Sequence, residues 1–356
     1  PSTPAAQKPS EIRIGVIGPE TGGAAQLGQA QKNAVTMAVE EINAKGGVDG
    51  MQIKVFFEDD EGSPTKSANA ATRLIHETKV SVIIGAIHSS ATLADMAVTQ
   101  KAGIPQITAG STGASITEQG NPYIFRTAVN DALQAEALVK HAKGRGLKKL
   151  ALITASDDYG QSGAKLLRSA AEKEGLQVVT AENFANGDKD FKGQLLKIQE
   201  KGADSLFFWG LYTEAALIAK QARTLGINVP LFGGSGIATG KLMELGGAAV
   251  EGMVITQSFL PDDPDAMVQE FVKKYKGRFN VDPIPHGAQA YDTVYVIADA
   301  AKRAKSTDPA KLRDAIAATK LTTGVTGGTE FNKQGDDTGN RILLTVVKDG
   351  KFVLVK

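Results

Sequence analysis

Cysteine is absent from the 356-residue sequence, which excludes disulfide bonds, thiolate catalysis and metal sites built on cysteine. Histidine is scarce: the four histidines are far apart, and none falls in a His-Glu-x-x-His or similar metal-binding spacing. Long apolar runs are also missing, because no stretch approaches the roughly 18 residues needed to span a bilayer. We therefore expect no metal site and no direct insertion into a membrane.

An excess of charge of one sign is missing as well. Lysine and arginine together number 40, against 39 aspartates and glutamates, and no long basic run occurs. A protein that binds nucleic acid through its phosphates normally carries a basic stripe or patch. The composition therefore argues against nucleic acid as a partner.

The sequence also lacks the usual signatures of catalysis and cofactor binding. It has neither the phosphate-binding Gly-x-x-x-x-Gly-Lys-Ser/Thr loop nor a Gly-x-Ser-x-Gly nucleophile elbow. Gly234-Ser235-Gly236 lacks the third glycine of a dinucleotide-binding loop. The acidic pair Asp157-Asp158 is interpreted as helix-start charges rather than as an acid and base. We expect a protein that is not an enzyme and needs no cofactor.

The overall pattern is one of short β-branched runs that alternate with amphipathic helices. An apolar strand at 12–17 precedes a helix over 26–45, and similar pairs continue to 254–257. This alternation predicts an α/β fold with parallel sheets covered on both faces, and a chain of 356 residues fits two lobes. The segment 341–355 predicts an appended β-hairpin around Lys348-Asp349-Gly350.

Residues 1–10 form a polar, proline-rich stretch before the first predicted strand. The stretch is typical of a mature exported protein after removal of its signal peptide, although an arbitrary boundary would read the same. We expect residues 1–10 to form a flexible N-terminal segment.

Two loops carry small hydroxyl residues at the carboxyl ends of the predicted strands 80–84 and 104–108. The candidate binding residues in these loops are Ser89, Ser90, Gly110, Ser111 and Thr112. At such a corner, free backbone N–H groups and the helix dipole favour an anion. The alternative is that Ser89, Ser90 and Thr112 are only helix N-caps, but the pairing of the two loops favours a carboxylate site.

A series of different short motifs occurs along nearly the whole chain from residue 11. They are Ile14-Gly15-Val16-Ile17-Gly18-Pro19, Glu41-Ile42-Asn43-Ala44-Lys45-Gly46-Gly47-Val48, Gly103-Ile104-Pro105, Phe125-Arg126-Thr127, Tyr159-Gly160, Asp190-Phe191, Glu251-Gly252 and Tyr291-Asp292. In this order they resemble the branched-chain amino acid binding proteins of ABC importers, within the type I periplasmic binding proteins. The resemblance implies a two-lobed clamshell, in which each lobe is a mostly parallel sheet flanked by helices and the chain crosses between lobes three times.

The resemblance also implies where the lobes begin and end. The N-terminal lobe would comprise 11–127 plus 259–328, and the C-terminal lobe 128–258 plus 329–356, with hinges near Thr127, Ser258 and Gly328. Hinge closure would trap a ligand in the cleft and present a surface to the ABC permease subunits. A periplasmic, monomeric receptor is the expectation. A ligand sensor for a signalling receptor is the alternative from a different class.

Several site residues carry over from the family by position. Ser89 matches the serine that holds the ligand carboxylate, and Gly110 with Thr112 matches the second-loop pair that contacts carboxylate and amine. Tyr159 matches the second-lobe tyrosine that closes over the ligand. A further aromatic contact is expected from Trp209 or Tyr212.

One position departs from the family pattern. Ser235 stands where the amino acid binders place an acidic residue against the ligand ammonium. Because a buried ammonium without a carboxylate costs several kcal/mol, another residue must compensate. Asp131 corresponds to an aspartate near the amine in related modules of glutamate receptors, and its alternative role is a helix N-cap.

The ligand expected from this pattern is an aliphatic, branched-chain amino acid. If Asp131 does not reach the cleft, the alternative is an aromatic or other carboxylic acid without an amine. At the side-chain end of the pocket, Glu20 is interpreted as an exposed loop residue that has the reach to contact a polar ligand group. His286 is a candidate for the mouth of the cleft.

Overall fold

The computed structural model describes residues 11–355, so the predicted flexible segment 1–10 lies outside the described residues. The first sheet contains five parallel strands in the order β2-β1-β3-β4-β5. Its strands are β1 (Glu11–Gly18), β2 (Gln52–Asp59), β3 (Val82–Ile84), β4 (Gln106–Thr108) and β5 (Ile124–Arg126).

Alternation of side chains along β1 explains why this sheet is covered on both faces. Ile12, Ile14 and Val16 pack into one core with side chains of the C-terminal helices, whereas Ile17 packs on the other face with Leu74. The helices of this lobe are α1 (Ala25–Ala44), α2 (Pro64–Arg73), which continues as a π-helical turn (Leu74–Thr78), α3 (Ser89–Ala102), α4 (Ser115–Glu118), α10 (Ala266–Phe279), α11 (Pro285–Ala304) and α12 (Pro309–Ala317).

The second sheet has seven strands in the order β14-β13-β10-β9-β8-β6-β7. Its strands are β6 (Lys149–Ala155), β7 (Gln177–Phe184), β8 (Ser205–Trp209), β9 (Leu231–Gly233), β10 (Val254–Gln257), β13 (Leu343–Lys348) and β14 (Lys351–Leu354). The pairs β10–β13 and β13–β14 are antiparallel, whereas the other pairs in this sheet are parallel. The predicted C-terminal hairpin is thus confirmed as the edge of an otherwise parallel sheet.

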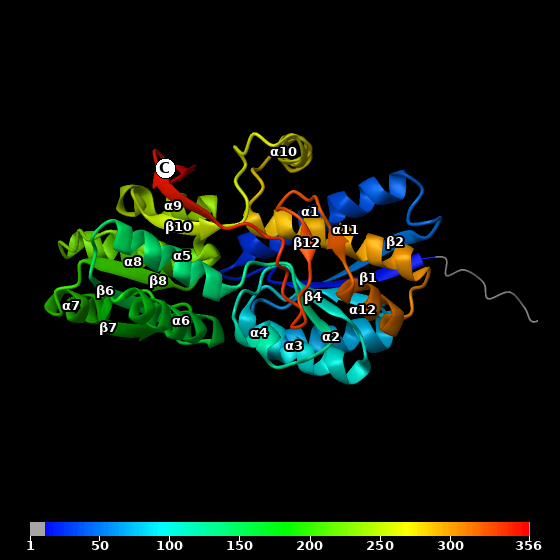
Figure 1. The fold of residues 1–356 in the computed structure, drawn as a ribbon, viewed down its shortest axis with the longest axis horizontal. Coiled ribbons are helices and arrows are strands. Elements are labelled where there is room, and N and C mark those ends of the chain that lie inside the picture. The colour runs from blue at the N-terminus through cyan, green and yellow to red at the C-terminus, as the bar shows by residue number, and fades with distance from the viewer. Residues whose placement is uncertain (1–10, 356) are drawn as a thin grey trace, which may run out of the picture.

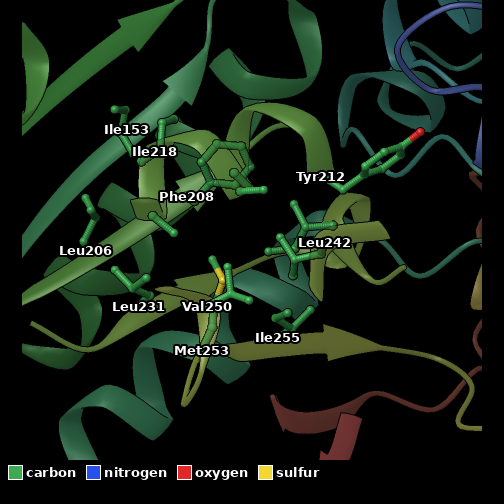
Figure 2. Close-up of a cluster of buried hydrophobic side chains, with 14 of the residues drawn as sticks. Ile153, Leu206, Phe208, Tyr212, Ile218, Leu231, Leu242, Val250, Met253 and Ile255 are labelled. Carbon is green, nitrogen blue, oxygen red and sulfur yellow. The ribbon is translucent and has the colours of Figure 1, made fainter. Parts of the chain in front are cut away.

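Both faces of the second sheet are buried too. Phe208 faces the larger cluster shown in Figure 2, whereas Phe207 and Trp209 face the opposite cluster. The helices here are α5 (Asp131–Gly144), α6 (Asp158–Glu174), α7 (Lys192–Glu200), α8 (Tyr212–Thr224) and α9 (Gly240–Gly246), with 3₁₀ turns at Ser235–Ile237 and Gly247–Val250.

The two sheets form two lobes that lie side by side along the molecule (Figure 1). The chain passes between them after β5, after β10, and between the small strand pair β11 (Lys320–Leu321) and β12 (Thr329–Glu330) and strand β13. These passages confirm the two-lobed α/β architecture with three crossings. In the described part of the chain, no helix combines the length and the apolar character that a membrane span requires.

Candidate functional site

A small cavity lies between the two lobes, and only about 20 Å³ of it is open to the centre of a water molecule. Its walls come from both lobes: Leu27, Ile87, His88, Ser89, Gly110, Thr112, His286, Asp157, Tyr159, Asn186, Gly210, Leu211, Ser235 and Gly236. A groove of about 570 Å³ outside it shares His88, Asn186 and Leu211 with the cavity. These three residues therefore separate the cavity from the mouth of the cleft.

Ser89 is the first residue of α3 and lines the cavity. Its hydroxyl accepts a hydrogen bond from the backbone N–H of Gly113 at 3.3 Å, which ties the first loop to the second. His88 occupies the N-cap position of α3, and Thr112 lies before α4, whose N-cap position is Ala114. The N-cap interpretation of Ser89, Ser90 and Thr112 is therefore wrong.

Ser111 connects the two loops rather than lining the cavity. Its hydroxyl donates to the carbonyl of Ile87 at 2.8 Å and lies 2.6 Å from the hydroxyl of Thr92. Ser90 is also not part of the cavity wall. Gly110 is part of it, and a Cβ atom there would lie 3.1 Å from Cγ1 of Ile87, so glycine permits the close approach of the loops.

Arg126 fixes the position of the Thr112 loop. This guanidinium is fully buried, and its Nη1 donates to the carbonyls of Thr112 and Gly113 at 2.9 and 2.6 Å. Its Nε donates to Asp336 at 2.8 Å, which lies on the segment between β12 and β13. Sequence reasoning used Arg126 only as part of a motif and did not assign it this role.

Tyr159 closes the cavity from the second lobe. It lies in the first turn of α6, where Asp157 is the N-cap and accepts from the N–H of Gly160 at 2.9 Å. Within residues 11–355 the Tyr159 hydroxyl is buried without a hydrogen-bond partner. Burial and the charge of Asp131 raise the pKa of Tyr159 well above its usual value, so the phenol stays a neutral donor. Gly236 leaves room for it, since a Cβ there would lie 2.8 Å from the hydroxyl.

The two aromatic candidates of the Trp209–Tyr212 loop do not line the cavity. Trp209 is fully buried behind Tyr159, with ring centroids 6.1 Å apart. The hydroxyl of Tyr212 points away from the second-lobe cluster (Figure 2). The next residue, Thr213, donates its hydroxyl to the carbonyl of Gly23 at 3.2 Å, which joins the lobes at the cavity edge. Gly210 and Leu211 supply the wall in this loop instead.

Asp131 lies behind the cavity wall, in the first turn of α5. The N-cap interpretation of Asp131 is wrong, because Asn130 is the cap and accepts from the N–H of Ala132 at 2.8 Å. One Asp131 oxygen accepts from Gln134 at 3.2 Å, and the other is buried without a partner among the described residues. Burial raises the pKa of the Asp131 carboxyl to about 7, against the opposing influence of Thr112, Arg126 and Trp209.

Ser235 lines the cavity and is linked to Asp131 through Gln134. The backbone N–H of Ser235 donates to the Gln134 side-chain oxygen at 2.9 Å.

Glu20 pairs with Lys32 at 2.5 Å and is not part of the cavity wall. Within residues 11–355, no group of three or more histidines, aspartates or glutamates is arranged to hold a metal.

Sequence reasoning assigned no binding role to His88, Asp157 and Asn186, which all line the cavity. Asp157 accepts from the Asn186 side chain at 2.8 Å as well as from Gly160, so both of its oxygens are used. A usable signal existed for two of them: His88 directly precedes Ser89, and Asp157 lies two residues before Tyr159. His286, the candidate for the cleft mouth, is also on the wall.

A cavity enclosed between two α/β lobes, at the carboxyl ends of parallel strands, defines a clamshell ligand-binding protein rather than a single-domain module. The chain belongs to the periplasmic binding protein family, whose sequence model matches residues 11–351.

Similar proteins are found in several bacteria. The leucine-, isoleucine-, valine-, threonine- and alanine-binding protein of Pseudomonas aeruginosa is 30% identical over 91% of this chain and 87% of its own. The crystal structure of a leucine-binding protein from Thermotoga maritima has a TM-score of 0.91 and 30% identity, and covers 97% of this chain and 98% of its own. An ABC transporter solute-binding protein from Rhodopseudomonas palustris, in complex with 3,4-dihydroxybenzoic acid, has a TM-score of 0.88 and 25% identity, and covers 97% and 96%.

Proposed function

We propose that this protein is the periplasmic solute receptor of an ABC importer and that it binds a small carboxylate-bearing ligand between its lobes. The observation that carries the proposal is the interlobe cavity, whose wall combines Ser89, at the start of a helix, with the hydroxyl of Tyr159, buried without a partner in residues 11–355. A buried polar group without a partner costs free energy, and a polar ligand removes that cost.

The carboxylate is held by neutral donors. The first N–H groups of α3 have no acceptor within their own helix, and Ser89 adds a hydroxyl beside them. Thr112 lies across from Ser89 on a loop that Arg126 holds by two hydrogen bonds to backbone carbonyls. The charge of Arg126 is compensated by Asp336, so the carboxylate is bound by dipoles rather than by an ion pair.

The ligand proposed on family grounds is an aliphatic amino acid, with Asp131 as the partner of its ammonium. The similar proteins from Pseudomonas and Thermotoga are named for such ligands. An ammonium close to Asp131 would lower the raised pKa of its carboxyl and use the oxygen that has no partner in residues 11–355.

A carboxylic acid without an amine is the second candidate, and the residue at position 235 favours it. Ser235 provides no charge at the cavity wall, Asp131 lies behind that wall, and both Asp157 oxygens are already bonded. The similar protein from Rhodopseudomonas holds such an acid. No covalent bond is made or broken in either case.

Transport function requires that the lobes open and close. We place two of the hinges near Thr127 and Ser258. The third lies after β12 rather than near Gly328, because β12 pairs with β11 and Asp336 bonds to Arg126 of the first lobe. The permease would recognise the closed conformation, which forms when ligand is bound. Contacts such as Thr213 to Gly23 support closure over the cavity, because they join the lobes at its edge.

Isothermal titration with leucine and with benzoate tests the proposal, together with small-angle scattering at saturating ligand. We expect heat from one of the two acids and a smaller radius of gyration when that acid is bound. Tight benzoate binding without leucine heat would select the second candidate. Binding of either acid at an unchanged radius would contradict the clamshell mechanism.

A further inference from the structure

Two imidazoles, His88 and His286, lie on the cavity wall but take no part in the carboxylate site. They come from distant parts of the chain, His88 from the N-cap position of α3 and His286 from the first turn of α11. The Nδ1 atom of each ring is buried without a hydrogen-bond partner within residues 11–355. Both rings belong to the cavity wall, so a polar group of a ligand is the partner available to them, and unpaired buried nitrogens are costly.

The His88 ring packs on a different loop from the hydroxyl of Ser89. The hydroxyl of Ser89 is directed towards Gly113, whereas the ring of His88 packs against Gly62, where a Cβ would lie 2.7 Å from its Cε1 atom. His286 follows Pro285 at the start of α11, next to Gly287, which packs closely on the backbone of Ala30 in α1. His88 also borders the outer groove at the mouth of the cleft, whereas His286 is buried deeper in the wall, close enough to His88 for its pKa to be lowered by it.

Both rings are neutral at neutral pH. Burial lowers the pKa of His286 to about 4, and the neighbouring His88 acts in the same direction. Burial also lowers the pKa of His88, although the charges of Asp60 and Asp157 oppose it. A neutral imidazole carries one N–H donor and one acceptor nitrogen, so the pair suits a hydroxyl or carbonyl better than a charged group.

Apolar side chains also line the cavity. Leu27, Ile87 and Leu211 lie on the same wall and suit the hydrocarbon body of a ligand. A ligand that is apolar throughout would fill this space but would leave both imidazoles unpaired.

We propose, on the basis of the carboxylate-binding function proposed above, that His88 and His286 form a polar subsite for the end of the ligand opposite its carboxylate. The chemical class that fits is a small carboxylic acid with a hydroxyl or carbonyl at its far end. The two imidazoles are specificity-determining residues, because they bind the part of the ligand that differs among such acids.

Matched ligand pairs test the subsite, since each pair exchanges a methyl for a hydroxyl at constant shape. The pairs are 4-methylbenzoate with 4-hydroxybenzoate and norvaline with homoserine, measured by isothermal titration. In the parent protein, we expect the hydroxyl member of at least one pair to bind roughly ten-fold more tightly. His286→Leu and His88→Leu should each reduce that ratio towards one, while His286→Gln should retain most of it.

His76→Leu is the matched control, because His76 is exposed on the π-helical turn and should leave the ratio unchanged. Near-ultraviolet circular dichroism shows whether each variant is folded, and the Gln variant reports on the subsite if a Leu variant is not. Equal affinity of the parent for both members of each pair overturns the subsite but leaves the carboxylate proposal standing. Failure of all four acids to bind the parent overturns both.

Discussion

The two ends of the cavity differ in how their polar groups are satisfied. At the carboxylate end, Ser89 and Thr112 stand on a scaffold whose members bond to one another, through Ser111 to Ile87 and through Arg126 to Thr112. At the other end, His88 and His286 each keep a buried nitrogen unpaired within residues 11–355. The polar groups of the first end are held in place by the protein itself, whereas we propose that those of the second end are satisfied only by a ligand.

The strongest test of the scaffold is Arg126→Met. Removing the guanidinium takes its hydrogen bonds from Asp336 and from the carbonyls of Thr112 and Gly113, and it leaves the charge of Asp336 without its cation. Removing one member of a buried ion pair typically costs about 3–5 kcal/mol of stability. Urea denaturation should show a loss in the free energy of unfolding of that order, together with weaker ligand binding.

Arg73→Met is the matched control for Arg126, because Arg73 pairs with Glu58 on the surface. An exposed pair contributes about 0–1 kcal/mol. Equal losses in the two variants would show that Arg126 does not organise the carboxylate end.

The second test changes the carboxyl behind the wall, by Asp131→Asn. Because burial raises the pKa of Asp131 to about 7, its charged form is disfavoured in the folded protein. The buried carboxyl therefore lowers the free energy of unfolding once it would be ionised in the unfolded chain. This loss is absent below about pH 4, grows as the pH rises, and reaches about 4 kcal/mol above about pH 7. The variant should therefore gain stability relative to the parent as pH rises from 4 to 8, measured by urea denaturation at each pH. A constant difference across this range would contradict the raised pKa.

The same variant separates the two ligand classes. If Asp131 binds the ammonium of an amino acid, Asp131→Asn should abolish the heat of leucine binding, because the buried positive charge loses its carboxylate. Benzoate binding, where present in the parent, should change little. Unchanged leucine affinity would remove Asp131 from the site.

Ser89→Ala and Thr112→Ala probe the carboxylate directly. A hydrogen bond to a charged group contributes about 1.5–3 kcal/mol, so each variant should weaken binding roughly ten-fold or more without unfolding the protein. Ser90→Ala is the comparison, because Ser90 lies next to Ser89 but not on the wall. The carboxylate site would be wrong if both Ser89→Ala and Thr112→Ala bound as tightly as the parent.

The smallest effect is expected at the contact between the lobes, from Thr213→Ala. It removes the hydrogen bond to Gly23 that forms only when the lobes meet, which contributes about 1 kcal/mol and a few-fold in affinity. Thr224→Ala serves as the control, since that hydroxyl bonds within its own helix, to the carbonyl of Lys220. Identical affinities in the two variants would show that this contact does not stabilise closure.

The alternation of short apolar strands with amphipathic helices is a local signal, so the α/β fold could be predicted from the sequence, and the chain length indicated two lobes. The clamshell and its three crossings were predicted only from the family resemblance. The sequence also located the two loops at strand ends, and Ser89, Gly110, Thr112, Tyr159 and Ser235 do line the cavity. Whether these residues bind a ligand stays a prediction.

The direction of individual side chains was harder to predict. Ser90 follows Ser89 by one helical position, about 100° around the axis, and so leaves the wall. Trp209 is the last residue of β8, in which successive side chains face opposite cores. Its ring lies in the core behind Tyr159. His88 was missed because its ring packs against Gly62, on a loop that is distant in the sequence. The residues around His88 give no signal of such a contact.

The central claim is that a carboxylate binds between the lobes, and the most direct measurement compares acids with their amides. Isothermal titration of the parent protein with leucine and leucinamide, and with benzoate and benzamide, changes only the group that we propose to bind at Ser89 and Thr112. We predict that the acid of at least one pair binds and that its amide gives no measurable heat. An amide that binds as tightly as its acid, or the absence of binding by either acid, would contradict the account.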